Sequence, residues 1–236
     1  MRAEGQFRSF LRAVHPRQAL AFAVVVGVLV ALMGRPVREV LSAAGAVLVA
    51  QLIMGLLNDV LDVEVDRSSG ATGKPVAEGI IPAGNAKFLI AVLLLLVLPL
   101  SLQNGTRSGL VLLSTLVVGF VHNRWLKATA LSWVGWSATF ALLTYFVTYG
   151  GWGAAADGSA PFTSFVVLCA VLGFLVHFLT ALPDLVVDNM AKVRHLPLRI
   201  ALRTGAPRLM VLTLVATVVV LGLIIYTTAL SASIAH

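Results

Sequence analysis

Two groups of acidic side chains stand at the ends of apolar stretches, and their spacing suits the binding of a hard cation. The first acidic motif covers residues 58–67, Asn-Asp-Val-Leu-Asp-Val-Glu-Val-Asp-Arg, and the second acidic motif covers residues 184–188, Asp-Leu-Val-Val-Asp. Together they hold six of the ten Asp and Glu residues in the chain. Carboxylates are costly beside hydrocarbon, so such groups usually mark a site. Grouped carboxylates bind Mg²⁺, which in turn holds phosphate oxygens.

Helical periodicity brings these carboxylates together within each motif. At 100° per residue, Asp59, Asp62 and Asp66 fall within about a 60° arc of one helix. Asp184 and Asp188 are one turn apart and share a face of another helix. Acidic side chains at a helix C-terminus oppose the helix dipole, and like charges one turn apart repel. The pattern therefore predicts metal-ligating carboxylates at all five positions.

A polar, glycine-rich loop with two cations follows the first acidic motif. Residues 67–79 include Arg67 and Lys74, and their backbone N–H groups and positive charges suit a phosphate. The loop lacks the spacing of a Walker A sequence. Lys127 adds a further cation between two later apolar stretches, where either anchoring at the membrane edge or contact with a phosphate explains it.

The elements that must position these residues are predicted to be membrane-spanning helices. AVILMFWYC residues make up 59% of the chain and charged residues 11%, far from the composition of a soluble domain. The apolar runs do not alternate, which excludes a membrane β-barrel and favours an all-α polytopic fold. A span needs about 20 residues. Seven uncharged stretches qualify, at 18–34, 40–57, 88–106, 108–123, 128–156, 158–183 and 209–236.

Lys and Arg are distributed unevenly across a seven-span topology. The N-terminal segment and the loops after the second, fourth and sixth spans hold fourteen of the seventeen, and the other side holds Arg35, Arg38 and Arg107. Because positive residues mark the cytoplasmic side, we expect the N-terminus and both acidic motifs to be cytoplasmic and the C-terminus external. The formal net charge of +7 therefore reports topology and a basic face for anionic substrates. Nucleic-acid binding is not expected from it.

These residues resemble the signatures of the UbiA superfamily of intramembrane prenyltransferases. Its first signature is similar to Asn58-Asp59-x-x-Asp62-x-x-x-Asp66 followed by Lys74-Pro75 and a glycine, and its second is similar to Asp184-x-x-x-Asp188. The segment that ends in Lys127 resembles the Tyr-x(3–4)-Lys element of the family, and His15-Pro16 resembles its entry to the first helix. The resemblance covers residues 15–208.

The resemblance implies a single integral-membrane domain over residues 1–236, with a central cavity capped on the cytoplasmic side. It implies Mg²⁺ ions that bridge the two acidic motifs to a prenyl diphosphate. The metal and diphosphate ligands would be Asn58, Asp62, Asp66, Asp184 and Asp188. Diphosphate oxygens would be held by Arg67, Lys74 and Lys127.

Three departures from the family pattern stand out. Members usually have nine helices and this chain has about seven. Either the cavity wall is incomplete, or lipid or another subunit, such as a second copy of the chain, closes its sides. His122 stands in place of the tyrosine of the Tyr-x(3–4)-Lys element. Lys74 replaces the more frequent arginine, which keeps the charge and loses bidentate geometry.

Three functions follow from these residues. The first is Mg²⁺-dependent transfer of a prenyl group to an aromatic or other small acceptor in a bacterial or archaeal cell membrane. The second is a membrane terpene cyclase that acts on the prenyl diphosphate alone. The third is a non-enzymatic transporter of cations or lipid phosphates, which does not explain two acidic motifs beside a phosphate-type loop. No general base stands out, and His177 and Asp59 are the candidates.

We predict the topology of the chain from this charge asymmetry. Reporter fusions at residues 70 and 190 should report the cytoplasm, and fusions at residues 155 and 236 should report the outside, because Lys and Arg hold loops on the cytoplasmic side. A cytoplasmic signal at residue 236 would contradict the seven-span topology. The shortest stretch, 108–123, would then be the first to lose its assignment as a span.

Overall fold

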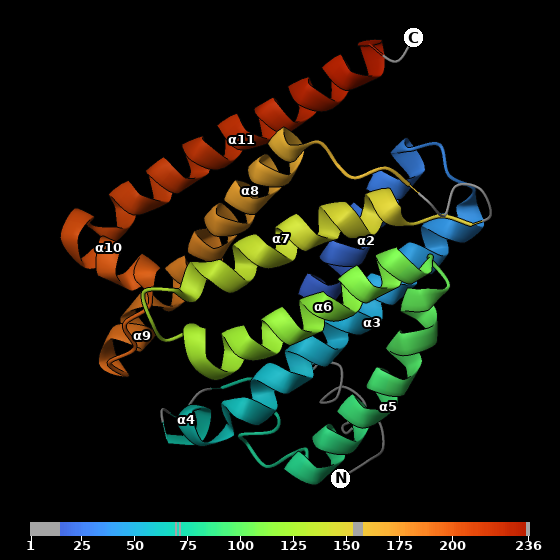
Figure 1. Cartoon of the computed structure of the whole chain (residues 1–236). Coiled ribbons are helices and arrows are strands. Elements are labelled where there is room, and N and C mark those ends of the chain that lie inside the picture. Colours follow the sequence, from blue (N-terminus) through green and yellow to red (C-terminus); the bar gives the residue numbers. More distant parts are fainter. Residues whose placement is uncertain (1–14, 69, 71, 153–157, 235–236) are drawn as a thin grey trace. The chain divides into compact units, whose positions relative to one another are not determined.

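The structure is a computed structural model that describes residues 15–68, 70, 72–152 and 158–234, and its regular elements in those residues are all helical (Figure 1). The predicted all-α fold is therefore confirmed. The long helices are α2 (Pro16–Leu32), α3 (Val37–Leu61), α5 (Ala83–Leu102), α6 (Thr106–Val121), α7 (Ser132–Tyr149), α8 (Thr163–Ala181) and α11 (Ala206–Ile234). The short ones are α4 (Val63–Ser68), α9 (Leu185–Met190), α10 (Leu196–Thr204), the π-helical turn η1 (His122–Leu126) and the 3₁₀ turn η3 (Leu182–Asp184).

Five helical segments in the described residues are long and apolar enough to cross a membrane. They are Val37–Leu61, Ala83–Leu102, Thr106–Leu126, Thr163–Met190 and Ala206–Thr228. Helix α2 is apolar but only 17 residues long, and the 18 residues of α7 include polar Ser, Thr, Tyr and Trp side chains. The structure thus supports a polytopic membrane protein, and the count of seven spans stays a prediction. Three basic residues in the topology argument lie outside the described residues: Arg2, Arg8 and Arg12.

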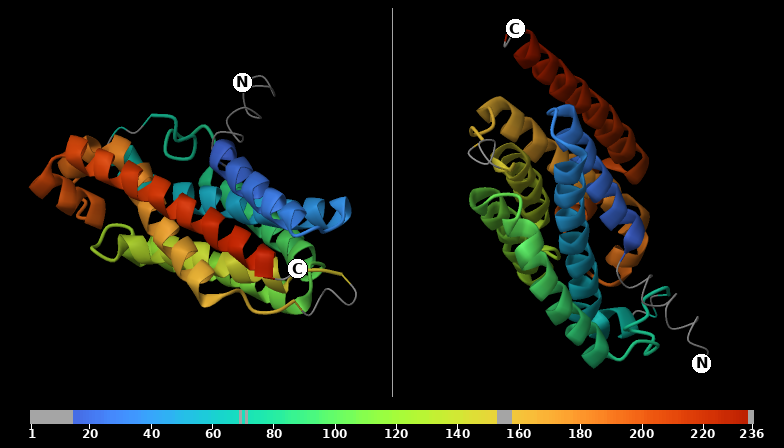
Figure 2. Two further views of the ribbon diagram at one scale, coloured as in Figure 1. Left: turned by 90° about the horizontal axis from the view of Figure 1, so that it is seen from above. Right: turned by 90° about the vertical axis from the view of Figure 1, so that its right-hand side faces the viewer.

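The chain divides into two compact units. Unit 1 comprises residues 1–123 and 146–159, and unit 2 comprises residues 124–145 and 160–236. In unit 1, α2 packs along α3, and α3 packs in turn on α5 and α6 (Figure 2). Small residues permit the close approach of α2 and α3, since a Cβ on Gly27 would lie 3.4 Å from Cβ of Ala44. Val26 and Val30 of α2 and Val47 of α3 are buried in the core.

In unit 2, helix α8 packs against α11 and α10. One apolar core joins four helices of this unit and consists of Phe178, Leu185, Leu198, Ala201 and Leu209. Because each of α8, α9, α10 and α11 supplies at least one of these side chains, the two short helices are fixed to the two long ones. This core positions the segment that contains the second acidic motif.

The periodicity of the first acidic motif predicted one continuous helix, but the structure divides the motif between two helices. Helix α3 ends at Leu61, Asp62 is its C-cap with φ −92° and ψ −1°, and α4 begins at Val63. The Asp62 N–H still donates to the Asn58 carbonyl, and the Asp66 N–H donates to the Asp62 carbonyl. Asp is a poor residue for a helix interior because its side chain competes for backbone groups. The motif is therefore divided between two helices, but Lys74 still lies 2.8 Å from Asp59 and 3.9 Å from Asp66. The shared arc of Asp59, Asp62 and Asp66 stays a prediction.

The second acidic motif is also divided. Helix α8 ends at Ala181, the η3 turn follows, and α9 begins at Leu185. Pro183 explains the change, because proline has no N–H to donate and its ring clashes with the carbonyl four residues earlier. Asp184 thus ends a 3₁₀ turn and Asp188 lies in α9, so the helical segment Thr163–Met190 includes both carboxylates but changes helix type between α8 and α9.

Candidate functional site

Asp59 is the most deeply buried carboxylate of the first acidic motif. Its side chain is 1% exposed, although it lies in the last turns of an apolar helix. Its Oδ1 accepts a hydrogen bond from Nζ of Lys74 at 2.8 Å and lies 3.1 Å from Nε2 of His15. Its Oδ2 is buried without a hydrogen-bond partner among the described residues. Asp59 therefore joins three segments of unit 1: the residue before α2, the end of α3 and the following loop.

Lys74 lies between two carboxylates of this motif. Besides its bond to Asp59, its Nζ lies 3.9 Å from Oδ2 of Asp66. Burial acts to lower the pKa of Lys74, but the hydrogen bond and charge of Asp59 and the charges of Asp66 and Asp62 outweigh it, so the pKa is raised above 10.5. The ammonium group is therefore charged at neutral pH and offsets part of the negative charge of the motif.

The loop that carries Lys74 is held by its own apolar residues and turns. Val76 and Ile81 are buried against Leu56 of α3 and Ala86 of α5. The Gly73 N–H donates to the Glu78 carboxylate at 2.6 Å. The expectation that this backbone would wrap a phosphate therefore meets a competing bond at Gly73, because its amide already has an acceptor.

The remaining residues of the first acidic motif are more accessible than Asp59. Asn58, Asp62 and Asp66 are half-buried, whereas Glu64 is 82% exposed. Arg67 is exposed and lies 3.4 Å from both the Glu64 carboxylate and the Ala77 carbonyl. The structure thus distinguishes the fully buried Asp59 from Asn58, Asp62 and Asp66, which are half-buried like Lys74.

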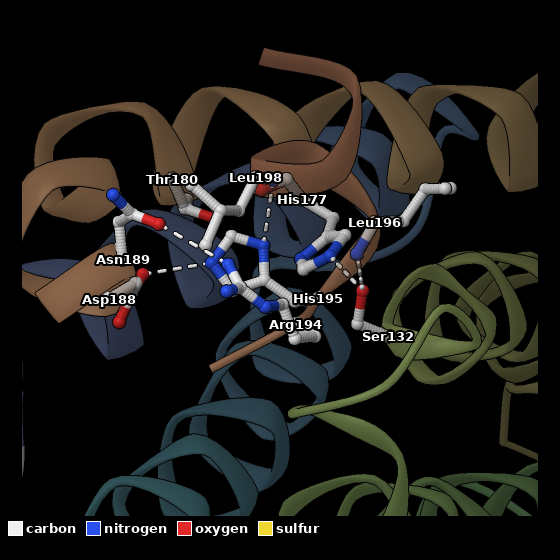
Figure 3. Close-up of polar contacts among 9 residues, drawn as sticks. All are labelled: Ser132, His177, Thr180, Asp188, Asn189, Arg194, His195, Leu196 and Leu198. Atoms are coloured by element: carbon white, nitrogen blue, oxygen red, sulfur yellow. Dashed lines mark hydrogen bonds and ion pairs between the residues drawn. The ribbon is translucent and has the colours of Figure 1, made fainter. Parts of the chain in front are cut away.

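The second acidic motif is organised by a histidine that the sequence analysis did not single out. Asp184 is exposed, and Oδ2 of Asp188 lies 2.8 Å from Nε2 of His195 (Figure 3). His195 is buried and is the N-cap of α10, where its Nδ1 accepts the Leu198 N–H at 3.1 Å. Pro197 marks the start of a helix in the sequence, but histidine is not a usual cap. The contact of His195 with Asp188, seven residues earlier, had no sequence signal.

A second buried histidine extends this network. His177 of α8 lies with its Nε2 2.9 Å from Oγ of Ser132, at the start of α7, and Ser132 Oγ accepts the Leu196 N–H at 3.1 Å (Figure 3). The Trp136 ring stacks on the imidazole of His177 with centroids 6.0 Å apart. His177 therefore fastens α7, α8 and the start of α10 together. This contact favours a structural role for His177 over that of a general base.

The predicted site residues fall into both units. Asn58, Asp59, Asp62, Asp66, Arg67 and Lys74 belong to unit 1, and Lys127, Asp184 and Asp188 belong to unit 2. Lys127 is half-buried and lies between η1 and α7. In the described residues, no group of three His, Cys, Asp or Glu side chains is arranged to hold a metal by itself. Mg²⁺ commonly takes one or two carboxylates and completes its shell with water and substrate phosphates. The oxygen donors of both motifs fit that pattern.

The fold and the two acidic motifs define a helical membrane protein with oxygen ligands at the ends of its apolar helices. The profile of the UbiA prenyltransferase family matches residues 19–235. The chain therefore belongs to the UbiA prenyltransferase family. No curated protein matches the chain by sequence.

Solved structures share this fold at low sequence identity. A UbiA homologue from Archaeoglobus fulgidus bound to GPP and Mg²⁺ has a TM-score of 0.72 and 17% identity, over 93% of this chain and 78% of the other. A structure of a UbiA homologue from Archaeoglobus fulgidus bound to DMAPP and Mg²⁺ has a TM-score of 0.70 and 17% identity, over the same shares of the two chains. A structure of digeranylgeranylglyceryl phosphate synthase has a TM-score of 0.62 and 18% identity, over 92% of this chain and 76% of the other.

We expect Asp59→Asn to lower the stability of the detergent-solubilised protein at pH 7 by roughly 3 kcal/mol, because Lys74 keeps its desolvation cost and loses its charged partner. The raised pKa of Lys74 gives stability that is complete below 10.5 and is lost as the pH rises through the higher folded value. The difference in Tm between Asp59→Asn and the wild type should therefore become smaller as the pH rises through the pKa of Lys74 in the folded protein.

The control for this experiment is Glu64→Gln, which removes an exposed carboxylate from the same motif. Its ion pair with Arg67 spans 3.4 Å between exposed side chains, so its removal should change stability by less than about 0.5 kcal/mol. Equal stability of the two variants at pH 7 would show that the Asp59–Lys74 pair contributes nothing.

Proposed function

We propose that this protein is a Mg²⁺-dependent prenyltransferase that moves a prenyl group from a prenyl diphosphate to an aromatic or other small acceptor within the membrane. The observation that carries the proposal is the first acidic motif in a UbiA family chain, where the half-buried Asp62 and Asp66 lie close to the charged Lys74. The Archaeoglobus fulgidus homologues bound to GPP or DMAPP with Mg²⁺ support the choice of donor.

The proposed metal ligands are the carboxylates of both motifs with Asn58 and Asp59 beside them. Mg²⁺, when bound, supplies the positive charge that makes diphosphate a good leaving group. Asp62 and Asp66 are half-buried oxygen donors of unit 1, and Asp184 and Asp188 are oxygen donors of unit 2. Asp59 has one oxygen bonded to Lys74 and a second that is buried without a hydrogen bond among the residues that the structure describes. Its main task is therefore to hold Lys74.

The proposed diphosphate ligands are Arg67, Lys74 and Lys127. An ammonium group has three donors, so Lys74 can keep its bond to Asp59 and still donate to diphosphate oxygens. These cations would share the negative charge that develops as the carbon–oxygen bond breaks. The apolar helices around the site would keep water from the prenyl cation until the acceptor attacks it.

We infer that the two units act as one catalytic domain over residues 1–236, with its N-terminus and active site on the cytoplasmic side. The support for one domain is that the family profile runs from residue 19 to residue 235 and so includes both units. The support for the orientation is the excess of Lys and Arg in loops predicted to be cytoplasmic. The lipid of the bilayer would then solvate the prenyl tail.

The proposal predicts that purified protein releases diphosphate from GPP or DMAPP only with Mg²⁺ and that mass spectrometry finds a prenylated acceptor. Suitable acceptors for a panel are naphthoate, benzoate, homogentisate, porphyrin, glycerol phosphate and sugar phosphate. Asp62→Asn and Asp184→Asn should each lower diphosphate release by at least about 100-fold, because each removes a metal ligand.

Glu64→Gln is the matched control, since it removes an exposed acidic charge of the first acidic motif and should keep wild-type turnover. Near-normal turnover by both Asp variants at saturating Mg²⁺ would contradict the proposed site. A hydrocarbon product formed without any acceptor would instead identify a terpene cyclase, and binding without diphosphate release would favour a transporter.

A separate prediction concerns Lys127. If Lys127 contacts the diphosphate, Lys127→Gln should lower catalytic efficiency by roughly 30- to 150-fold, the effect of a lost charge-assisted hydrogen bond of about 2–3 kcal/mol. Lys127→Arg should recover part of this loss because it keeps the charge. Wild-type kinetics of Lys127→Gln would assign Lys127 to anchoring at the membrane edge.

A further inference from the structure

We propose that His195 is the positioning residue of the second acidic motif: its imidazole holds the Asp188 carboxylate in a fixed orientation for a divalent cation while its other nitrogen caps α10. This inference rests on the proposed function, because the cation is the Mg²⁺ of that proposal. It assigns a role to a residue that lies seven positions beyond the motif.

The hydrogen bonds of His195 determine where its proton lies. Nδ1 accepts the backbone N–H of Leu198 at 3.1 Å, and a ring nitrogen that accepts a hydrogen bond has no proton of its own. The ring proton is therefore on Nε2, which lies 2.8 Å from Oδ2 of Asp188 and donates to it. His195 is thus a neutral donor with one defined tautomer.

The surroundings of His195 prevent its ring from turning away. Its side chain is 7% exposed, and the ring packs edge-on against His177, with centroids 6.4 Å apart and planes at 71°. The next residue, Leu196, is tied through its N–H to Oγ of Ser132 (Figure 3). Leu198 lies in the core of unit 2. The donor aimed at Asp188 is therefore attached to the packed core of unit 2.

Asp188 has the features of a carboxylate held by one oxygen and available through the other. Its side chain is 27% exposed and its bond to His195 uses only Oδ2. A histidine or similar donor behind a ligating carboxylate commonly fixes its orientation and raises metal affinity. Because His195 is neutral, it orients Asp188 without the positive charge that Lys74 brings to Asp59. The full negative charge of Asp188 is therefore kept for the cation.

Two amide substitutions separate the two tasks of His195. Asn places a side-chain oxygen near the position of Nδ1, so His195→Asn keeps an acceptor for the helix cap but is too short to reach Asp188. Gln places an amide N–H near the position of Nε2, so His195→Gln keeps a donor for Asp188 and loses the cap. If His195 only stabilised the fold, metal affinity and stability would fall together in both variants.

The experiment measures Mn²⁺ affinity by electron paramagnetic resonance in the full chain, with a non-reactive thio analogue of GPP, and the Tm without metal. We expect His195→Asn to weaken Mn²⁺ binding by about 10- to 100-fold at a Tm near that of the wild type. We expect His195→Gln to keep Mn²⁺ affinity within about threefold of the wild type and to lower the Tm by about 2–4 °C.

Wild-type Mn²⁺ affinity in His195→Asn would overturn the positioning role. A loss of Mn²⁺ affinity in both variants that parallels their loss of Tm would overturn it as well. The Asp188→Asn variant distinguishes this failure from failure of the proposed function. If the wild type binds Mn²⁺ no better than Asp188→Asn, the proposed metal site and the role of His195 fall together. If the wild type binds and Asp188→Asn does not, an unaffected His195→Asn removes the positioning role alone.

Discussion

A buried carboxylate at the end of an apolar helix is the constraint on which unit 1 depends. Desolvation of Asp59 costs several kcal/mol unless charged and hydrogen-bonded partners offset it, and its partners come from distant parts of the chain. Lys74 brings the glycine-rich loop onto α3, and His15 brings the start of α2 to the same carboxylate. The apolar contacts of Val76 and Ile81 with Leu56 then hold the loop in place. Asp62 and Asp66 are half-buried near the positive charge of Lys74, which lies outside their own motif.

Unit 2 meets the same requirement in a different way. Asp188 is bonded to a neutral imidazole rather than to a cation, so this partner does not offset its negative charge as Lys74 offsets that of Asp59. The cost of this arrangement is a second buried polar network, because His195, Ser132 and His177 must all find partners inside an apolar unit. Their bonds satisfy that need and join α7, α8 and α10. A network with every member paired also rigidifies the segment that contains it.

Sequence reasoning identified the helical class, the membrane setting and the acidic residues, since each depends on local composition or on spacing. Apolar runs without alternation can satisfy their backbone groups in a bilayer only as helices, and the family profile over residues 19–235 agrees with the motifs. The sequence did not reveal where the two helices that contain the acidic motifs change at Asp62 and at the 3₁₀ turn Leu182–Asp184. Periodicity assumes a regular helix, whereas Asp62 and Pro183 each interrupt one.

The sequence by itself determined which residues are available for chemistry: carboxylates, an amide and cations near the ends of apolar helices. The tertiary structure decided what each of them does, because a role follows from burial and from partners that are distant along the chain. Asp59 and Asp62 look equivalent in the motif, yet Asp59 is fully buried and bonded to Lys74, fifteen residues away, whereas Asp62 is half-buried. His195 has no motif of its own and becomes important only through Asp188. Hydrogen bonds and desolvation depend on three-dimensional distance, which residue spacing encodes only within a helix.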